Sequence, residues 1–328
     1  PPRPPAPPPP VWRAGRARHA LAAVAGAVAL AVASWLVVAN AGGGEESPRA
    51  ADPGGGPSPR LDTGTGADEG PLADLVPQDV REAGGIVVHA GSAHDPVIFT
   101  EDGEDELTGF EVDLLGAIGE RLGVAVTFAP VDDRRAAAEA AVQEGRAAAA
   151  HIAVGNFVDD EEERAALGVD FVNHFVDGWA VVSEDPERSA DLDDLCGLRV
   201  TLYEGSPTED SVRESTRDCS RPAEIVPAAT KDDMAEAIGA GEADVAVLLY
   251  TQAAYYVAEN PETGLSVSFS DEQRGSRGIA VPSGQGELRG AVHEALGALM
   301  RDGTYGELLR RWHIEDAALD RPAVNRGS

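Results

Sequence analysis

The sequence has little positive charge for its length. Its 328 residues include 26 lysines and arginines against 57 aspartates and glutamates, which gives a formal net charge of −31. Nucleic acids and anionic bilayer surfaces bind proteins through basic patches, so neither is an expected partner. Lys231 is the only lysine, which indicates a coding bias rather than a function. We therefore expect an acidic surface and no nucleic-acid partner.

Cysteine is also scarce, since Cys196 and Cys219 are the only two in the chain. Two isolated cysteines without a nearby histidine supply only half of a zinc site, so we expect no metal there. Outside the cytoplasm two such thiols are expected to oxidise. Closing the loop between them would stabilise the fold by roughly 3 kcal/mol in the chain-entropy model. We predict this disulfide.

Charged residues are missing altogether from a long run near the start of the chain, residues 20–41. About 20 apolar residues in a helix span the ~30 Å hydrocarbon core of a bilayer. Arginines precede the run and glutamates follow it. The positive-inside rule then places the Pro/Arg-rich segment 1–19 in the cytoplasm and everything after residue 42 outside.

A cleaved signal peptide is the alternative for 20–41, because Ala39-Asn40-Ala41 matches an A-x-A cleavage pattern. The apolar run is longer than the ~7–15 residues typical of signals, and a proline-rich lead is unusual, so we favour an uncleaved anchor. No cysteine lies near the run, which excludes lipid attachment at its end. Both alternatives export the rest of the chain.

Large apolar residues are few in 42–79, a composition typical of a disordered linker. Beyond it, short apolar runs alternate with amphipathic stretches, which predicts βα units, an α/β fold and largely parallel sheets. Strands are expected at 85–89, 124–129, 149–154, 178–183, 198–203, 243–249 and 278–282. Helices are expected at 109–122, 134–144, 206–217, 230–240, 250–259, 285–301 and 303–312. In the first of these helices Thr108 and Glu111 are spaced for a capping box, and Gly123 should end it.

Five segments follow one another in a characteristic order: LTGFEVDLLGAIGERLG, the ER…VDF pattern at 163–171, ADLDDLCGLRVTLYEGSP, GEADVAVLL and MRDGTYGELLRRW. Together they resemble the extracytoplasmic solute-binding proteins of amino-acid ABC importers, solute-binding family 3, over residues 80–315. The resemblance implies a two-lobed periplasmic-binding-protein-like (type II) fold that closes on a solute around a hinge. It implies lobe 1 at 83–183 and 275–315, lobe 2 at 186–272, and a flexible tail at 316–328. Tyr305 and Trp312 should anchor the core.

The resemblance also implies site residues in the first lobe. Arg164 follows five consecutive acids, at a position where the family binds the ligand α-carboxylate, and guanidinium matches that group bidentately. The alternative is an exposed ion pair, worth ~0.2–1 kcal/mol. Gly155, Phe157 and Asp159 lie in the same ligand-contacting stretch, whereas Glu161 replaces the family's threonine.

In the second lobe, Gly205, Ser206 and Thr208 resemble the family's turn at a helix N-terminus, where free N–H groups suit an anion. A simple helix cap is the alternative. Leu249 occupies the position of the family's ammonium-binding aspartate. Since an unpaired buried ammonium would cost several kcal/mol, ordinary amino-acid binding needs another carboxylate, or the ligand lacks the amine.

Two carboxylates could take that role, Asp95 and the Asp159 already named. Asp95 belongs to the segment His94-Asp95-Pro96-Val97, which replaces the family's aromatic loop and puts His94 where a stacking ring is usual. His94 is either a ligand contact or a solvated loop residue.

We therefore expect a module that binds a small polar solute, an amino acid or related carboxylate, outside the membrane. It would deliver the solute to an ABC permease or report its presence inward through the anchor. We expect no catalytic residue, cofactor or metal. An enzyme on the same fold, such as a dehydratase, is the alternative, and the acids at 159–163 could supply a general acid only if one were buried.

Overall fold

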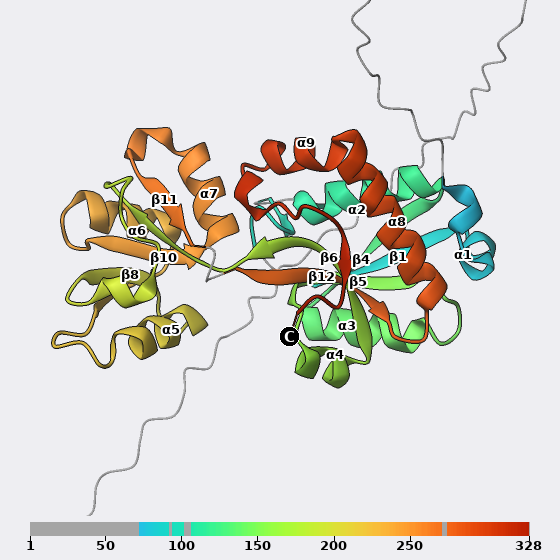
Figure 1. Cartoon of the computed structure of the whole chain (residues 1–328), viewed down its shortest axis with the longest axis horizontal. Coiled ribbons are helices and arrows are strands. Elements are labelled where there is room, and N and C mark those ends of the chain that lie inside the picture. Colours follow the sequence, from blue (N-terminus) through green and yellow to red (C-terminus); the bar gives the residue numbers. More distant parts are fainter. Residues whose placement is uncertain (1–71, 92–93, 102–105, 271–273, 328) are drawn as a thin grey trace, which may run out of the picture. The chain divides into compact units, whose positions relative to one another are not determined.

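A computed structural model describes residues 72–91, 94–101, 106–270 and 274–327 of the chain. All of these belong to one compact unit, Thr63–Ser328. Two main β-sheets organise them (Figure 1). One has the strand order β13-β6-β12-β5-β1-β4, and the other has the order β11-β7-β10-β8-β9. We call the parts built on these sheets the first and the second lobe.

The first lobe combines segments from both ends of the described chain. Its strands are β1 (Gly85–Gly91), β4 (Ala125–Val131), β5 (His151–Val158), β6 (Val169–Asp177), β12 (Gly275–Pro282) and β13 (Ala323–Val324). Its helices are α1 (Gln78–Ala83), α2 (Phe110–Leu122), α3 (Arg134–Glu144), α4 (Glu161–Leu167), α8 (Gly286–Asp302) and α9 (Thr304–Arg311). Helices α2 and α8 cover one face of the sheet and α3 covers the other (Figure 1). Tyr305 and Trp312 are buried, as the sequence predicted.

The second lobe is a single stretch of chain. Its strands are β7 (Trp179–Ser183), β8 (Arg199–Tyr203), β9 (Glu224–Ala228), β10 (Val245–Leu249) and β11 (Ser266–Phe269). Its helices are α5 (Pro207–Thr216), α6 (Lys231–Gly239) and α7 (Tyr250–Glu259). The described residues of the two lobes also include short 3-10 helices at Ala73–Leu75, Leu192–Leu195, Pro261–Thr263 and Glu315–Ala317. Strands β2 (Phe99–Thr100) and β3 (Leu107–Thr108) pair as a small antiparallel sheet. The disulfide between Cys196 and Cys219 is confirmed.

Both main sheets are mixed, which corrects the expectation of largely parallel sheets. Strand β1 is parallel to β4 and β5, and β8 is parallel to β9 and β10. However, β12 is antiparallel to β5 and β6, and β7 is antiparallel to β10 and β11. These antiparallel strands adjoin the two places where the chain passes between lobes, after Asp177 and after Phe269. Parallel neighbours within a sheet need a crossover connection, usually a helix. A strand that returns from the other lobe needs no such crossover and can lie antiparallel to its neighbours.

Helix α2 follows its sequence pattern except at its start. Gly123 ends it in the left-handed region at φ 70°, as expected. The capping box is wrong, because Thr108 lies in β3 and Gly109 at φ 124° is the N-cap residue. Glu111 is instead fully buried, with its carboxylate 3.0 Å from Nε2 of His174. The stripe facing the sheet is at most 1% exposed and consists of Phe110, Leu114, Ile118 and Leu122.

Two predicted boundaries need correction. The linker was expected to run to residue 79, but α1 already begins at Gln78 and buries Val80 completely. The tail 316–328 was expected to be flexible, but β13 within it pairs antiparallel with β6, with Ala323 opposite Asn173. The predictions for 1–19, 20–41 and 42–71 concern segments outside the described residues. Within the described part of the chain, no helix is long and apolar enough to cross a bilayer.

Candidate functional site

A cavity of about 620 Å³ lies where the two lobes meet, and residues of both line it. Its volume is within the ~300–1,000 Å³ usual for small-ligand sites. The first lobe contributes the start of α3, the end of β5 and the start of β12. The second contributes Trp179 and Tyr203, the start of α5 and the start of α7. The ionisable side chains in the described lining, apart from Tyr203, are Arg134, Asp177, Arg274 and Arg277.

Arg277 is the most distinctive of these side chains. It lies on β12, is only 6% exposed, and donates from Nε to Oδ1 of Asn156 at 2.9 Å and from Nη1 to the Gly275 carbonyl at 3.3 Å. No carboxylate of the described residues forms an ion pair with it. Burial lowers the pKa of Arg277, because the charged form has lost its hydration. A buried guanidinium with neutral partners is therefore available to an anion in the cavity.

Asn156 fixes this guanidinium and connects it to His94. Asn156 adopts φ 54°, in the left-handed region that asparagine tolerates. While its Oδ1 accepts from Arg277, its Nδ2 lies 3.1 Å from Nε2 of His94. His94 is thus placed behind the cavity wall and does not line the cavity itself.

Asp177 supplies the carboxylate of the cavity. It ends β6, is fully buried, and accepts from the backbone N–H groups of Gly178 and Thr251 at 3.0 and 3.2 Å. Its other oxygen accepts from the Thr251 hydroxyl at 3.0 Å. Leu249, the N-cap residue of α7, lines the same cavity and carries no charge. Among the described lining residues, the carboxylate is instead that of Asp177, at the end of β6.

The turn before α5 differs from the expected anion site. The Gly205 N–H donates to the carboxylate of Glu209 at 2.9 Å, and the Ser206 N–H donates to the Tyr203 carbonyl. This bond from Gly205, followed by that from Arg213, lowers the pKa of Glu209. The chain therefore fills its own N-terminal anion site with Glu209. Ser206 and Thr208 still line the cavity.

Asp95 has a partner from the other lobe. Lys231, at the start of α6, forms an ion pair with its carboxylate, and the lysine side chain is 16% exposed. The ammonium also lies 5.9 Å from the centre of the Tyr256 ring. Because the lysine already neutralises it, Asp95 is not the free carboxylate that we expected for a ligand ammonium.

Gly155 and Phe157 on β5 have structural roles. Phe157 is fully buried against Phe171, with ring centroids 5.6 Å apart, so the expectation of a ligand contact is wrong. Gly155 has φ 149°, and a Cβ there would lie 3.0 Å from Cβ of Arg134. Glycine is needed at this position because it lets the start of α3 approach the sheet and brings Arg134 to the cavity.

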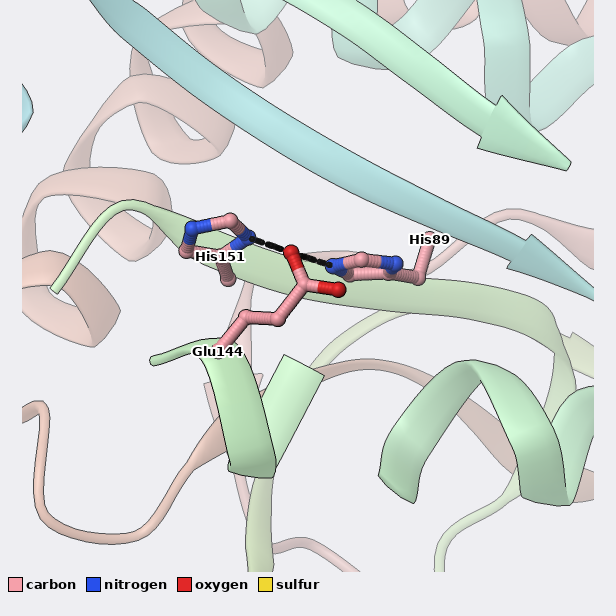
Figure 2. Close-up of side chains that lie close together, drawn as sticks. All are labelled: His89, Glu144 and His151. Carbon is pink, nitrogen blue, oxygen red and sulfur yellow. Dashed lines mark hydrogen bonds and ion pairs between the residues drawn. The ribbon is translucent and has the colours of Figure 1, made fainter. Parts of the chain in front are cut away.

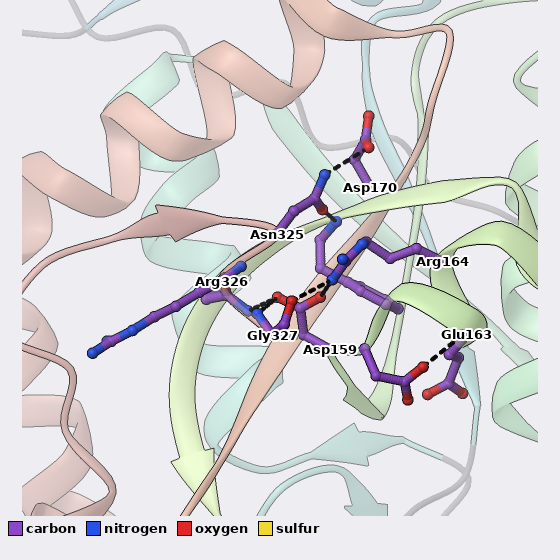
Figure 3. A network of polar contacts seen from close by, with 10 residues as sticks. Asp159, Glu163, Arg164, Asp170, Asn325, Arg326 and Gly327 are labelled. Atoms are coloured by element: carbon purple, nitrogen blue, oxygen red, sulfur yellow. Dashed lines mark hydrogen bonds and ion pairs between the residues drawn. The ribbon is translucent and has the colours of Figure 1, made fainter.

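Arg164 lies in a different place from the one that the resemblance implied. It forms an ion pair with Asp159 and donates to the Gly327 carbonyl at 3.2 Å (Figure 3). The Asp159 side chain is completely buried and also accepts from Asn173 and from the Gly327 N–H. Arg164 does not line the cavity, and this corrects the prediction of a cleft-lining clamp. The alternative prediction, an exposed ion pair, does not hold either, because the Arg164 side chain is only 16% exposed.

The tail explains this difference. Asn325 accepts from the Phe171 N–H at 2.8 Å and donates to Asp170 at 2.9 Å, which fixes the segment after β13 beside β6 (Figure 3). Gly327 is thereby held against Asp159 and Arg164. Because this segment was expected to be flexible, no partner for Arg164 was expected in it.

Sequence reasoning missed Arg277, Asp177 and Arg134. Arg277 directly precedes the strand expected at 278–282, and Asp177 directly precedes the one expected at 178–183. A charged residue at the edge of a buried apolar run, next to a passage between lobes, was the available signal. The sequence predicted Arg134 at the start of a helix but indicated no binding role for it.

Comparison with known proteins agrees with this architecture. The family model for bacterial extracellular solute-binding proteins, family 3, matches residues 86–315. The chain belongs to this family. It is 27% identical over 258 residues to the arginine-binding protein ArgT of Corynebacterium glutamicum, covering 76% of this chain and 81% of that protein. It is 26% identical over 257 residues to the L-cystine-binding protein TcyJ of Escherichia coli K12, covering 76% and 88%.

Among solved structures, an ancestral cationic amino acid solute-binding protein superposes with a TM-score of 0.60 at 23% identity, covering 72% of this chain and 98% of that one. At this identity the likeness supports the fold alone. The family and the fold together establish a two-lobed α/β solute-binding protein of the extracellular class. Its named relatives are binding proteins.

Proposed function

We propose that this chain binds an amino acid in the cavity between its lobes, with Arg277 holding the α-carboxylate and Asp177 the α-ammonium. The observation that supports this most directly is the buried Arg277, which has no carboxylate partner among the described residues. Burying such a charge is costly unless an anion compensates it, and a ligand carboxylate in the cavity would do so. Asp177 reaches the same cavity from the neighbouring strand, where Gly275 lies opposite it.

The charges in the lining support a neutral or acidic side chain on the solute. Three of the described lining residues are arginines and one is a carboxylate, Asp177, which the α-ammonium would use. A cationic side chain would lie near Arg134 and Arg274 in a lining whose described carboxylate is already used, and like charges disfavour binding. Trp179 and Tyr203 offer rings against which a short aliphatic stem can pack.

Calorimetry on the full chain tests this assignment. L-Glutamate, L-glutamine, L-arginine and L-cystine are titrated in turn, and we expect glutamate or glutamine to bind more tightly than arginine. L-Glutaminamide, in which an amide replaces the α-carboxylate, is the matched control and should bind much more weakly than L-glutamine. Tightest binding of arginine would overturn the proposed solute class, and equal binding of glutamine and its amide would overturn the role of Arg277.

We propose a binding role without catalysis. The chain would deliver its solute to an ABC permease or report the solute to a signalling partner inside the cell. The naming of the relatives as binding proteins supports it. If the purified chain converted any bound amino acid into a product, the non-catalytic role would be rejected.

We also propose the topology of the exported chain, with 1–19 in the cytoplasm, 20–41 as an anchor and 42–71 as a linker to the two lobes. The uncharged run and the arginines before it support this order. Protease added to intact cells should then remove the solute-binding lobes. Mature protein that begins at Gly42 in the medium would contradict the anchor and leave export intact.

A further inference from the structure

Three potential metal ligands meet on the first lobe, away from the cavity. They are His89 on β1, His151 at the start of β5 and Glu144 at the end of α3 (Figure 2). The proposed solute-binding function uses none of them.

The sheet geometry explains why both histidines face α3. Side chains alternate along a strand, and Val88 and Ala90, on either side of His89, pack on the opposite face with α2 and α8. Strands β1 and β5 are parallel, with Val87 opposite His151, so His89 is the diagonal neighbour of His151 on one face. The small side chains of Ala137 and Ala141 let α3 lie close to this face.

The ligand atoms are separated by distances that suit a tetrahedral ion. Nε2 of His89 and Nδ1 of His151 lie 3.1 Å apart. Oε2 of Glu144 lies 3.7 Å from the first nitrogen and 3.5 Å from the second. Zinc bonds of about 2.0–2.2 Å to nitrogen and oxygen place ligands about 3.3 Å apart at tetrahedral angles.

A hydrogen bond between two neutral imidazoles would account for the first distance alone. It leaves the Glu144 carboxylate beyond hydrogen-bond distance of both rings, although the carboxylate points between them (Figure 2). A cation in the centre accounts for all three distances. The negative end of the α3 dipole, at Glu144, also favours a cation there.

We propose that His89, Glu144 and His151 form a zinc site with three protein ligands and a fourth position open to water. The buried His89 and the half-buried His151, with side chains 4% and 15% exposed, form its floor, and Glu144, 54% exposed, closes it from the solvent side. Imidazole and carboxylate together suit Zn²⁺, whereas Mg²⁺ prefers an all-oxygen shell. The metal would tie the end of α3 to β1 and β5.

This site is separate from the solute cavity. Arg134 begins α3 at the cavity and Glu144 ends it, ten residues later, which corresponds to about 15 Å of helix. Metal binding and amino-acid binding can therefore be measured independently, and failure of one leaves the other standing.

Titration of the untagged full chain with zinc sulfate, followed by calorimetry, tests the site. We expect one Zn²⁺ per chain, no binding of Mg²⁺, and zinc affinity at least about tenfold lower in Glu144→Gln, since even outer-shell changes cost 10–100-fold. Glu139→Gln is the matched control, because Glu139 lies on the same helix, 65% exposed and paired with Arg135. It should bind zinc as the wild type does.

X-ray absorption at the zinc edge gives a second readout that does not depend on a variant. Two imidazole nitrogens at about 2.0 Å should appear in the inner shell. Absence of saturable one-to-one binding, unchanged affinity in Glu144→Gln, or an inner shell of oxygen alone would each overturn the proposal and leave an imidazole–imidazole hydrogen bond.

Discussion

The first lobe holds two arginines in contrasting surroundings, Arg164 in the middle of α4 and Arg277 on β12. The Arg164 guanidinium pairs with the completely buried carboxylate of Asp159 and with the Gly327 carbonyl. The Arg277 guanidinium has only neutral oxygen partners and faces the cavity between the lobes. Arg164, in the expected family position, already has a carboxylate partner inside the protein. Arg277, which no motif indicated, has no ion-pair partner among the described residues and is the arginine that we propose for the ligand.

Desolvation explains why the two arginines should behave differently. Taking a charge out of water costs several kcal/mol unless a counter-charge or hydrogen bonds offset it. Asp159 offsets this cost for Arg164 in the free protein, so the pair contributes to the folded state. In the proposed function a solute carboxylate offsets this cost for Arg277, so we expect its charge to contribute to binding. Replacing each arginine by methionine separates these two contributions.

The largest effect is expected on stability, in Arg164→Met. Removal of one partner of a buried ion pair costs about 3–5 kcal/mol. We expect about 3 kcal/mol here, the lower end, because Asn173 and the Gly327 N–H still bond to Asp159. Urea denaturation should show the lower unfolding free energy, while calorimetry shows unchanged amino-acid affinity.

Asn173→Asp is a useful companion to that measurement. It places a second carboxylate against Asp159, in a fully buried position, and should destabilise the same network without reaching the cavity. A loss of affinity in Arg164→Met with stability retained is the pattern that the family resemblance predicted. That outcome would show that Arg164, and not Arg277, binds the solute.

A smaller effect, on binding, is expected in Arg277→Met. Truncating one side of a buried charge pair costs about 2–5 kcal/mol, and we expect the lower end here, so amino-acid affinity should fall about thirtyfold. The free protein should be no less stable, since an uncompensated buried charge is removed. Arg277→Lys should recover part of the affinity because the charge returns without the planar fork.

Arg134→Met is the matched control for Arg277. Arg134 also lines the cavity, but its side chain is 49% exposed and lies 3.6 Å from the Glu163 carboxylate. Its removal should weaken binding much less. Equal losses in the two variants would mean that the cavity attracts anions through its general positive potential, without a specific carboxylate position at Arg277.

The fold could be predicted to the extent that it depends on local periodicity. The stripe of α2 and the apolar runs of β1, β5 and β10 identify elements within a few residues. Strand β6 was missed because Asn173 and His174 interrupt its apolar pattern, and both are buried through contacts from distant segments. Strand β9 contains Pro227, which weakens a strand pattern and fits its place at the sheet edge.

Residues of the site could be predicted only where a single motif of the sequence marks them. Ser206, Thr208 and Leu249 line the cavity because each sits where a strand meets a helix, and the motif marks those positions. The sequence could not show that Arg277 and Asp177 line one cavity. They lie on β12 and β6, which are neighbours in the sheet, but the whole second lobe separates these strands in the sequence. The pairing of Arg164 with the tail was hidden for the same reason.

The smallest effect is expected at the second-lobe wall of the cavity. Two hydroxyls there show the same contrast as Arg164 and Arg277, because one has a partner inside the protein and the other has none among the described residues. The Ser206 hydroxyl donates to the Tyr203 carbonyl at 2.7 Å, whereas the Thr208 hydroxyl has no hydrogen-bond partner among the described residues. Thr208→Val keeps the shape and removes one hydrogen bond to the solute, worth about 1 kcal/mol, so affinity should fall about fivefold.

Ser206→Ala is the matched control for this variant. It should lower stability slightly and leave affinity unchanged, because the Ser206 hydroxyl already bonds within the turn. Calorimetry and urea denaturation of both variants distinguish the two roles. Wild-type affinity in Thr208→Val would show that the second lobe closes over the solute without a hydrogen bond from this residue.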